Sequence, residues 1–166
     1  MTYQEPSVQA DDFQEAVNRH YPGLVQRLAL VLHDSEEAKD VAQEAYLRAY
    51  RSWDRFDGTD ARAWLHTIGL RLAFNVLRGR RRWTAWLSAE RREHVETWVS
   101  SERIDLWRAL GSLRPQHRAA LLLNVVDGYT QAEIAGMLDA PPGTVGRWIA
   151  EGKAHMRVAL GEESAA

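Results

Sequence analysis

Residues 130–157, TQAEIAGMLDAPPGTVGRWIAEGKAHMR, decide how the C-terminal part of the chain folds. Thr130 followed by Glu133 is the signature of a capping box, so we expect a short helix over residues 131–138. The DAPPG stretch ends that helix, and we expect Thr144 to cap a second one. Two short helices joined by a tight turn are typical of a helix-turn-helix, which places its second helix in the major groove of DNA.

The exposed face of this second helix is unusual for a DNA reader. Its early exposed positions hold Gly146, Arg147, Glu151 and Lys153. Arginine, lysine, asparagine and glutamine are the side chains that most often reach base edges and phosphates. A glutamate can accept a hydrogen bond from a cytosine amino group, but it repels phosphate. The segment therefore predicts a DNA-binding topology with a weak reading face.

A compact basic segment precedes this motif. Residues 1–60 carry 6 Lys and Arg against 12 Asp and Glu, residues 61–92 carry 8 against 1, and residues 93–166 carry 7 against 10. The basic segment is helical in its apolar period and ends in RGRRRWTAW, where Trp83 and Trp86 follow four arginines. Its polar side chains recur on one helix face: Thr67, Arg71, Asn75, Arg78 and Arg82. Arginines contact phosphates and aromatic rings stack on unpaired bases, so this ridge favours nucleic acid.

The N-terminal segment is predicted to be helical as well. Pro22 is expected to divide its first apolar stretch into two helices. Asp34 with Glu37 forms a possible capping box for the next helix. On that helix Glu44 and Arg48 are spaced for an i,i+4 ion pair on the face opposite the apolar one.

These patterns predict an all-α fold of two small helical domains. The expected boundaries are residues 8–87, a linker over 88–103, and residues 104–161. An extended linker of this length could span roughly 50 Å, so the two domains could lie well apart.

Composition excludes several classes of protein. The chain has no cysteine, which fits a reducing cytoplasm and excludes a disulfide scaffold. Its start is polar and acidic, unlike a secretory signal, and no apolar run is long enough to span a membrane. The histidines show no ligand or catalytic spacing, so no enzyme, metal site, cofactor or small-molecule substrate is expected.

The two halves together resemble conserved regions of the extracytoplasmic-function (ECF, group 4) bacterial sigma factors. DSEEAKDVAQEAYLRAYRSWDRFDG and ARAWLHTIGLRLAFNVLRGRRR resemble region 2, and residues 113–157 resemble region 4. The resemblance covers about residues 10–160. It implies a cytoplasmic subunit, associated with the nucleoid through polymerase, that binds RNA polymerase core and directs transcription initiation at promoter DNA. An anti-sigma factor is a possible further partner.

The resemblance assigns roles to particular residues. It implies core polymerase binding by Asp40, Gln43, Glu44 and Arg48. It implies contacts with the −10 element by Phe56, Arg71, Asn75, Arg78, Arg80, Arg81 and Arg82. It implies contacts with the −35 element by the helix-turn-helix residues Thr144, Arg147, Trp148, Glu151 and Lys153.

Three positions depart from the family pattern. The family usually has basic residues where this chain has Gly146 and Glu151, and position 75, often acidic, is Asn here. Gly146 and Glu151 keep one alternative open, an adaptor that binds an anti-sigma factor without reading promoters. A stand-alone helix-turn-helix regulator is a second alternative, and the slightly acidic C-terminal region argues against it.

Overall fold

The computed structural model describes residues 7–84 and 101–161, and every regular element in these ranges is helical. The N-terminal half contains α1 (Ser7–Leu32), α2 (Ser35–Arg51), the short 3₁₀ helix η1 (Trp53–Arg55) and α3 (Ala61–Thr84). The C-terminal half contains α4 (Ser101–Ser112), α5 (Pro115–Val125), α6 (Gln131–Leu138) and α7 (Pro142–Ala159). The all-α prediction is confirmed. The last three residues of the predicted linker, 101–103, belong to α4.

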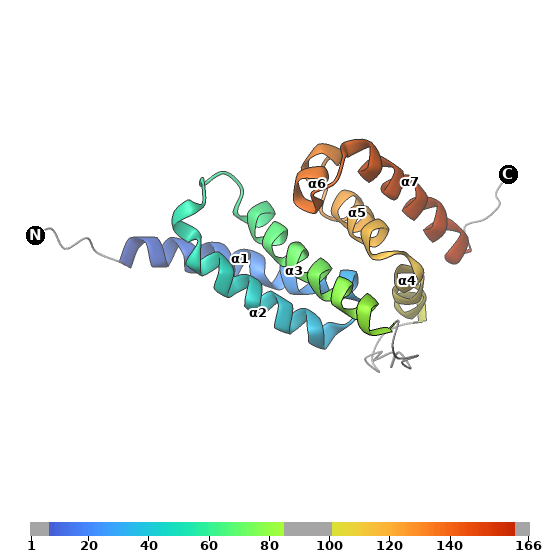
Figure 1. The fold of residues 1–166 in the computed structure, drawn as a ribbon, viewed down its shortest axis with the longest axis horizontal. Helices are drawn as coiled ribbons and strands as arrows, with labels where there is room; N and C mark the ends of the chain where they lie inside the picture. The colour runs from blue at the N-terminus through green and yellow to red at the C-terminus, as the bar shows by residue number, and fades with distance from the viewer. Residues whose placement is uncertain (1–6, 85–100, 162–166) are drawn as a thin grey trace, which may run out of the picture.

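The first three long helices pack on one another as a bundle (Figure 1). Their shared core contains Phe13, Leu24 and Leu28 of α1 and a row of fully buried alanines on α2. Helix α3 approaches α1 closely at Gly69, where a Cβ atom would come within 2.7 Å of Leu24 Cδ1.

The division of the first stretch at Pro22 is wrong, because α1 continues through the proline as one helix. Pro22 is exposed, and buried residues precede and follow it on the face that packs against α2 and α3. The proline removes one backbone hydrogen bond, but packing of a continuous apolar stripe stabilises a helix more than local propensity does.

One half of the predicted capping box is present at the start of α2, where the Asp34 carboxylate accepts a hydrogen bond from the Glu37 amide at 2.9 Å. The Glu37 carboxylate pairs with Arg80 of α3. The start of α2 is thereby tied to the C-terminal part of α3.

The capping box of Thr130 and Glu133 is confirmed at the start of α6, and its hydrogen bonds lower the pKa of Glu133. The predicted cap at Thr144 is wrong, because α7 begins at Pro142 and Thr144 lies inside it. A proline suits the first position of a helix, since its nitrogen has no hydrogen to leave unpaired.

Helix α6 buries Ile134, Ala135 and Met137, whereas Ala132 is exposed. Val125 at the end of α5 and Val126 after it are exposed as well.

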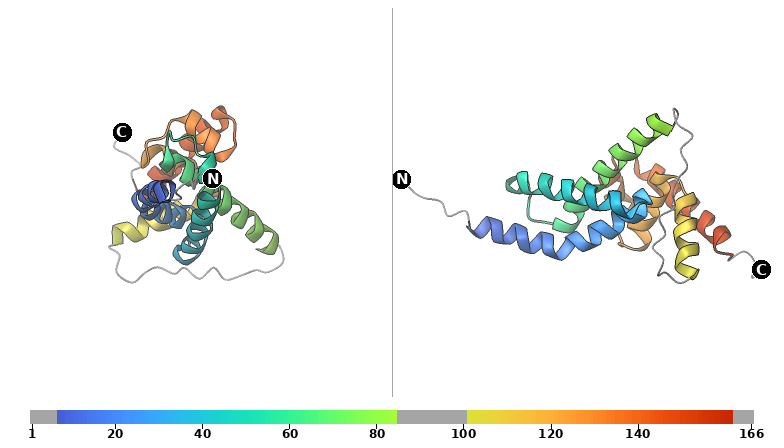
Figure 2. Two further views of the ribbon diagram at one scale, coloured as in Figure 1. Left: turned by 90° about the vertical axis from the view of Figure 1, so that its left-hand side faces the viewer. Right: turned by 90° about the horizontal axis from the view of Figure 1, so that it is seen from below.

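The two halves pack against each other and share a core, so the expectation that they could lie well apart is not what this structure shows. Val31 of α1 and Leu70 of α3 belong to the same buried cluster as the apolar residues of α5, α6 and α7. Figure 1 shows α5 and α6 beside α1 and α3, and Figure 2 shows the C-terminal end of α3 extending away from them.

Polar contacts hold this interface at two points. Asp127, in the turn before α6, accepts hydrogen bonds from Arg27 at 2.6 and 2.8 Å and from Arg62 at 2.8 Å. Arg118 of α5 is buried and donates to the carbonyl of Val31 at the end of α1. Its guanidinium also reaches carbonyls at the end of α4, so it satisfies orphan C=O groups of two helices.

Candidate nucleic-acid and partner interfaces

The exposed face of α2 carries the side chains assigned to core binding: Asp40, Gln43, Glu44 and Arg48. They point away from the buried alanines of the same helix. The predicted i,i+4 pair is confirmed, with Arg48 Nε 2.8 Å from Glu44 Oε1. Both side chains are about half exposed, so the pair contributes little to stability and leaves the charges available to a partner.

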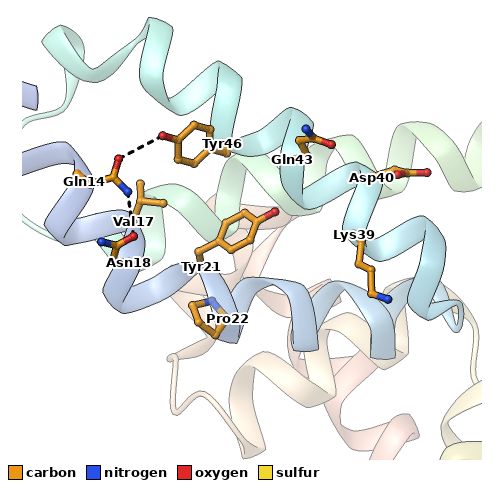
Figure 3. Close-up of a pocket in the computed structure, with 9 residues that line it drawn as sticks. All are labelled: Gln14, Val17, Asn18, Tyr21, Pro22, Lys39, Asp40, Gln43 and Tyr46. Carbon is orange, nitrogen blue, oxygen red and sulfur yellow. Dashed lines mark hydrogen bonds between the residues drawn. The ribbon is translucent and has the colours of Figure 1, made fainter. Parts of the chain in front are cut away.

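A groove lies between this face and α1, and Figure 3 shows its lining. Asp40, Gln43 and Tyr46 of α2 line one side, and Gln14 and Asn18 of α1 line the other. The Tyr46 hydroxyl donates to Gln14 Oε1 across the groove at 3.5 Å. The groove thus offers side-chain amides and an aromatic ring next to the charged face of α2.

The loop between α2 and α3 is anchored by aromatic rings. Phe56 is half-buried and stacks on Trp53, with ring centroids 4.9 Å apart, and it also contacts Trp64 of α3 at 5.2 Å. Trp53 in turn meets Phe13 of α1. Phe56, which is a predicted DNA contact, therefore belongs to a cluster of aromatic rings. This cluster fixes the position at which the loop leaves the helical bundle.

Beyond Phe56 the loop is exposed and internally hydrogen-bonded. Asp57 accepts from the amide and hydroxyl of Thr59, which lowers the pKa of the Asp57 carboxyl. Gly58 has a φ of 82°, a left-handed conformation that costs glycine nothing. Asp60 accepts from the Ala63 amide at 2.9 Å and so caps α3.

The polar ridge predicted on α3 is present from Thr67 to Arg78, the part of it whose side chains are described. Arg71, Asn75 and Arg78 follow one another along one side of the helix, and all three are exposed. Asn75 accepts a hydrogen bond from Arg78. Thr67 begins the ridge half-buried, with its hydroxyl donating to Ala63 O. Arg81 is exposed on the same C-terminal stretch.

Arg80 differs from the other arginines, because it faces α2. It pairs with Glu37, approaches Asp34 at 3.8 Å, and donates to Leu32 O at 3.3 Å. Arg80 thus joins α3 to the junction of α1 and α2. The side chains of Arg82 and Trp83, and Trp86 as a whole, lie outside the described residues.

Helix α7 presents the residues assigned to the −35 element. Arg147, Glu151 and Lys153 are exposed, and Thr144 and Trp148 are half-exposed. Val145, Ile149 and Gly152 face the opposite way into the core. The second helix of the motif is therefore held by its apolar side with its charged side open.

Two residues that sequence reasoning missed lie against this face. His117 of α5 meets Glu151, with Nε2 2.6 Å from Oε2. The side chain of Gln131 lies over Gly146, where a Cβ atom would come within 2.9 Å of the Gln131 Oε1. Neither contact has a local signal in sequence, since the partners are 34 and 15 positions apart.

No group of three or more His, Asp or Glu side chains in residues 7–84 and 101–161 is arranged to hold a metal ion. Each helix in these two ranges is too short or too polar to span a lipid bilayer.

Comparison with known proteins matches both halves. The sigma-70 region 2 family matches residues 16–83, and the sigma-70 region 4 family matches residues 103–156. The RNA polymerase sigma factor CarQ of Myxococcus xanthus is 32% identical over 92% of this chain and 91% of its own. The RNA polymerase sigma-H factor of Pseudomonas aeruginosa is 35% identical over 74% and 71%.

A solved structure shares the fold. The sigma factor RpoE of Bartonella quintana, crystallised with the anti-sigma factor NepR, superposes with a TM-score of 0.80 at 22% identity, covering 92% of this chain and 99% of that one. The ECF sigma-E factor of Escherichia coli K12 is 33% identical over 67% of each chain. With both regions present in order and relatives matched over most of their length, the chain belongs to the ECF family of RNA polymerase sigma factors, which initiate transcription and carry no catalysis of their own.

Proposed function

We propose that this ECF sigma factor uses three separate surfaces to bind core polymerase, the −10 element and the −35 element. The exposed ridge on α3 is the observation that supports this proposal most directly. Sigma factors bind RNA polymerase core and promoter DNA, so one surface must serve the polymerase and others the DNA. Adaptor and stand-alone regulator functions are not favoured, because the relatives matched across both regions are sigma factors.

The proposed core-binding surface is the outer face of α2. Asp40, Gln43, Glu44 and Arg48 are open to a partner there, and the groove beside them presents amides from α1. Mixed charges with hydrogen-bonding groups suit a polar protein surface, where charge complementarity sets register and partner choice.

The proposed −10 surface combines the loop at Phe56–Asp60 with the ridge of Arg71, Asn75 and Arg78. The loop is fixed by ring packing, and Arg71 and Arg78 are both exposed on α3, seven positions apart. Arginines placed this way neutralise successive phosphates, and an ordered loop can hold a base that has left the stack. Arg81 extends the surface. The intramolecular contacts of Arg80 favour a structural role for it.

The proposed −35 surface is the open side of α7. Thr144, Arg147 and Trp148 lie in its first two turns, where recognition helices contact bases, and Glu151 and Lys153 follow. This surface has few cations. We infer that it contributes modest contacts, made effective because core binding tethers it near the promoter.

Run-off transcription tests the assignment. Purified core polymerase is assayed with and without this chain on a library of promoter fragments, and a product from a defined start site is expected. The double variant Arg78→Gln and Arg81→Gln should lower promoter binding and reduce the slope of log affinity against log salt by roughly 1.5 units. An unchanged slope with normal folding would refute the phosphate role of the ridge.

We further propose that the chain is a group 4 member that works in the cytoplasm, associated with the nucleoid through polymerase, and that an anti-sigma factor binds it. A neighbour of 25% identity, CnrH, was solved in complex with the cytosolic domain of CnrY. Co-purification from cells, with mass spectrometry of the bound proteins, would identify such a partner. Recovery of core polymerase subunits alone would contradict this part of the proposal.

A further inference from the structure

His117 and Glu151 form a contact that the sigma-factor assignment does not explain. His117 lies in the first turn of α5, and its side chain is 13% exposed. Glu151 lies on the open side of α7, and its side chain is 55% exposed. Their 2.6 Å contact joins a nearly buried ring to a carboxylate on the DNA-facing helix.

The geometry assigns the proton of this contact. His117 Nδ1 is buried and has no hydrogen-bond partner among the described residues. A proton on Nδ1 would leave a buried donor unsatisfied, which is costly. A carboxylate oxygen can only accept a hydrogen bond, so Nε2 carries a hydrogen and donates it to Glu151 Oε2. The second oxygen, Oε1, has no partner among the described residues and remains an acceptor.

The contact between His117 and Glu151 also determines whether Arg147 can form an ion pair with Glu151. Arg147 is exposed four positions before Glu151, the spacing at which a helix forms ion pairs. No Arg147–Glu151 pair is present, because the carboxylate is turned to His117. Trp148 packs beside the ring, with centroids 6.1 Å apart, and limits where it can move. The arginine thus stays available for phosphate.

We propose that His117 is a positioning residue that holds Glu151 as the acceptor for a cytosine amino group in the −35 element. A carboxylate oxygen on a recognition helix is suited to accept from cytosine N4. A carboxylate with no fixed orientation would chiefly repel phosphate, whereas one held by His117 is directed at a single base. The inference rests on the proposed −35 function of α7.

The experiment measures base preference at each −35 position, using run-off transcription with full-length chain, core polymerase and a randomised −35 library. Wild type should prefer cytosine at one position by at least about fivefold. Glu151→Gln should shift the preference at that position to adenine, because a carboxamide pairs with adenine N6 and N7. His117→Ala should weaken the cytosine preference, since Glu151 is then released to Arg147.

A conservative variant separates positioning from folding. His117→Gln keeps an N–H donor near the place of Nε2 and should restore the cytosine preference. His155→Ala is the matched control: it removes a histidine from the same domain, one that contacts Ser112 at 2.7 Å, and should leave base preference unchanged. Melting temperatures of all variants verify that the domain is folded.

Each other outcome counts against the proposal. If Glu151→Gln leaves every base preference unchanged while Arg147→Ala alters one, α7 reads the −35 element without Glu151 and only the inference fails. If Glu151→Ala raises transcription equally on all −35 sequences, the carboxylate only repels phosphate. If wild type shows no −35 preference, the proposed −35 function fails with it.

Discussion

Replacing Asp127 by Asn should loosen the packing of the two halves. Asp127 is the carboxylate between Arg27 of α1 and Arg62 of α3, and its side chain is 6% exposed. The Arg27 side chain is 8% exposed, and its Nη1 has no acceptor within residues 7–84 and 101–161. The substitution removes the negative charge and turns a donor toward at least one guanidinium.

The magnitude follows from the burial of Arg27. Breaking a buried ion pair by removing one partner costs about 3–5 kcal/mol, because the remaining charge is buried without compensation. Asparagine keeps one acceptor oxygen, so we expect the lower end, about 3 kcal/mol. When the halves separate, Arg27 regains water, so this loss weakens the packed arrangement relative to the separated one by a factor of roughly 150. Arg62 is 39% exposed and contributes less.

Energy transfer between two dyes measures the packing directly. The chain has no cysteine, so cysteines introduced at Glu36 and Arg157 label one exposed site in each half. Wild type should give one high-transfer population. Asp127→Asn should add a low-transfer population and lower the urea midpoint of the C-terminal half.

Two comparisons make the result decisive. Glu15→Gln breaks an exposed i,i+4 pair with Arg19. It should leave the energy transfer unchanged and alter the free energy of unfolding by no more than about 0.5 kcal/mol. The double variant Arg27→Met with Asp127→Asn removes the uncompensated charge and should recover part of the loss. Unchanged transfer and an unchanged urea midpoint in Asp127→Asn would refute the reasoning.

Further predictions concern stability and binding. Burial lowers the pKa of His66 to about 4, so the unfolded chain binds a proton that the native chain does not; stability should fall as pH drops from 6.5 toward 4, by up to about 3 kcal/mol. Urea unfolding across this pH range should show a shallower dependence in His66→Asn, and equal slopes would contradict the assignment. Gly111→Ala would place Cβ 2.5 Å from the His33 ring, which is stacked on Trp107, and should destabilise the fold by about 1–3 kcal/mol. Gly136→Ala meets open space on α6 and should instead stabilise it by about 0.5–1 kcal/mol, so thermal melts that move both variants the same way would be inconsistent with this packing. Glu44→Ala should weaken core polymerase binding by at least about twofold and leave the melting temperature unchanged; loss of folding would make its role structural.

Contacts between residues within one helical turn could be predicted from the sequence. The capping box of Thr130 and Glu133, the Asp34 cap and the Glu44–Arg48 pair all join residues three or four positions apart. Such contacts depend on helix geometry alone, so sequence spacing is sufficient to predict them.

Two predictions of helix boundaries, at Pro22 and at Thr144, were wrong. Pro22 was expected to divide its stretch into two helices, but α1 continues through it. The apolar residues of α1 on both sides of Pro22 are buried against α2 and α3. Thr144 was expected to be a cap, but the pair of prolines before it begins α7 two residues earlier. Arg80 was grouped with its basic neighbours, yet one position along a helix turns a side chain by about 100°, which directs it to Glu37.

Periodicity and charge are properties of neighbouring residues, so the helical class, the order of the two regions and the ridge on α3 could be predicted from the amino-acid sequence. Folding is what places Asp127 between Arg27 and Arg62 and brings His117 into contact with Glu151. These partners are separated by 100, 65 and 34 positions, and no local rule relates them. These residues come into contact because the apolar faces of the helices pack together, which places side chains that are distant in the sequence next to each other.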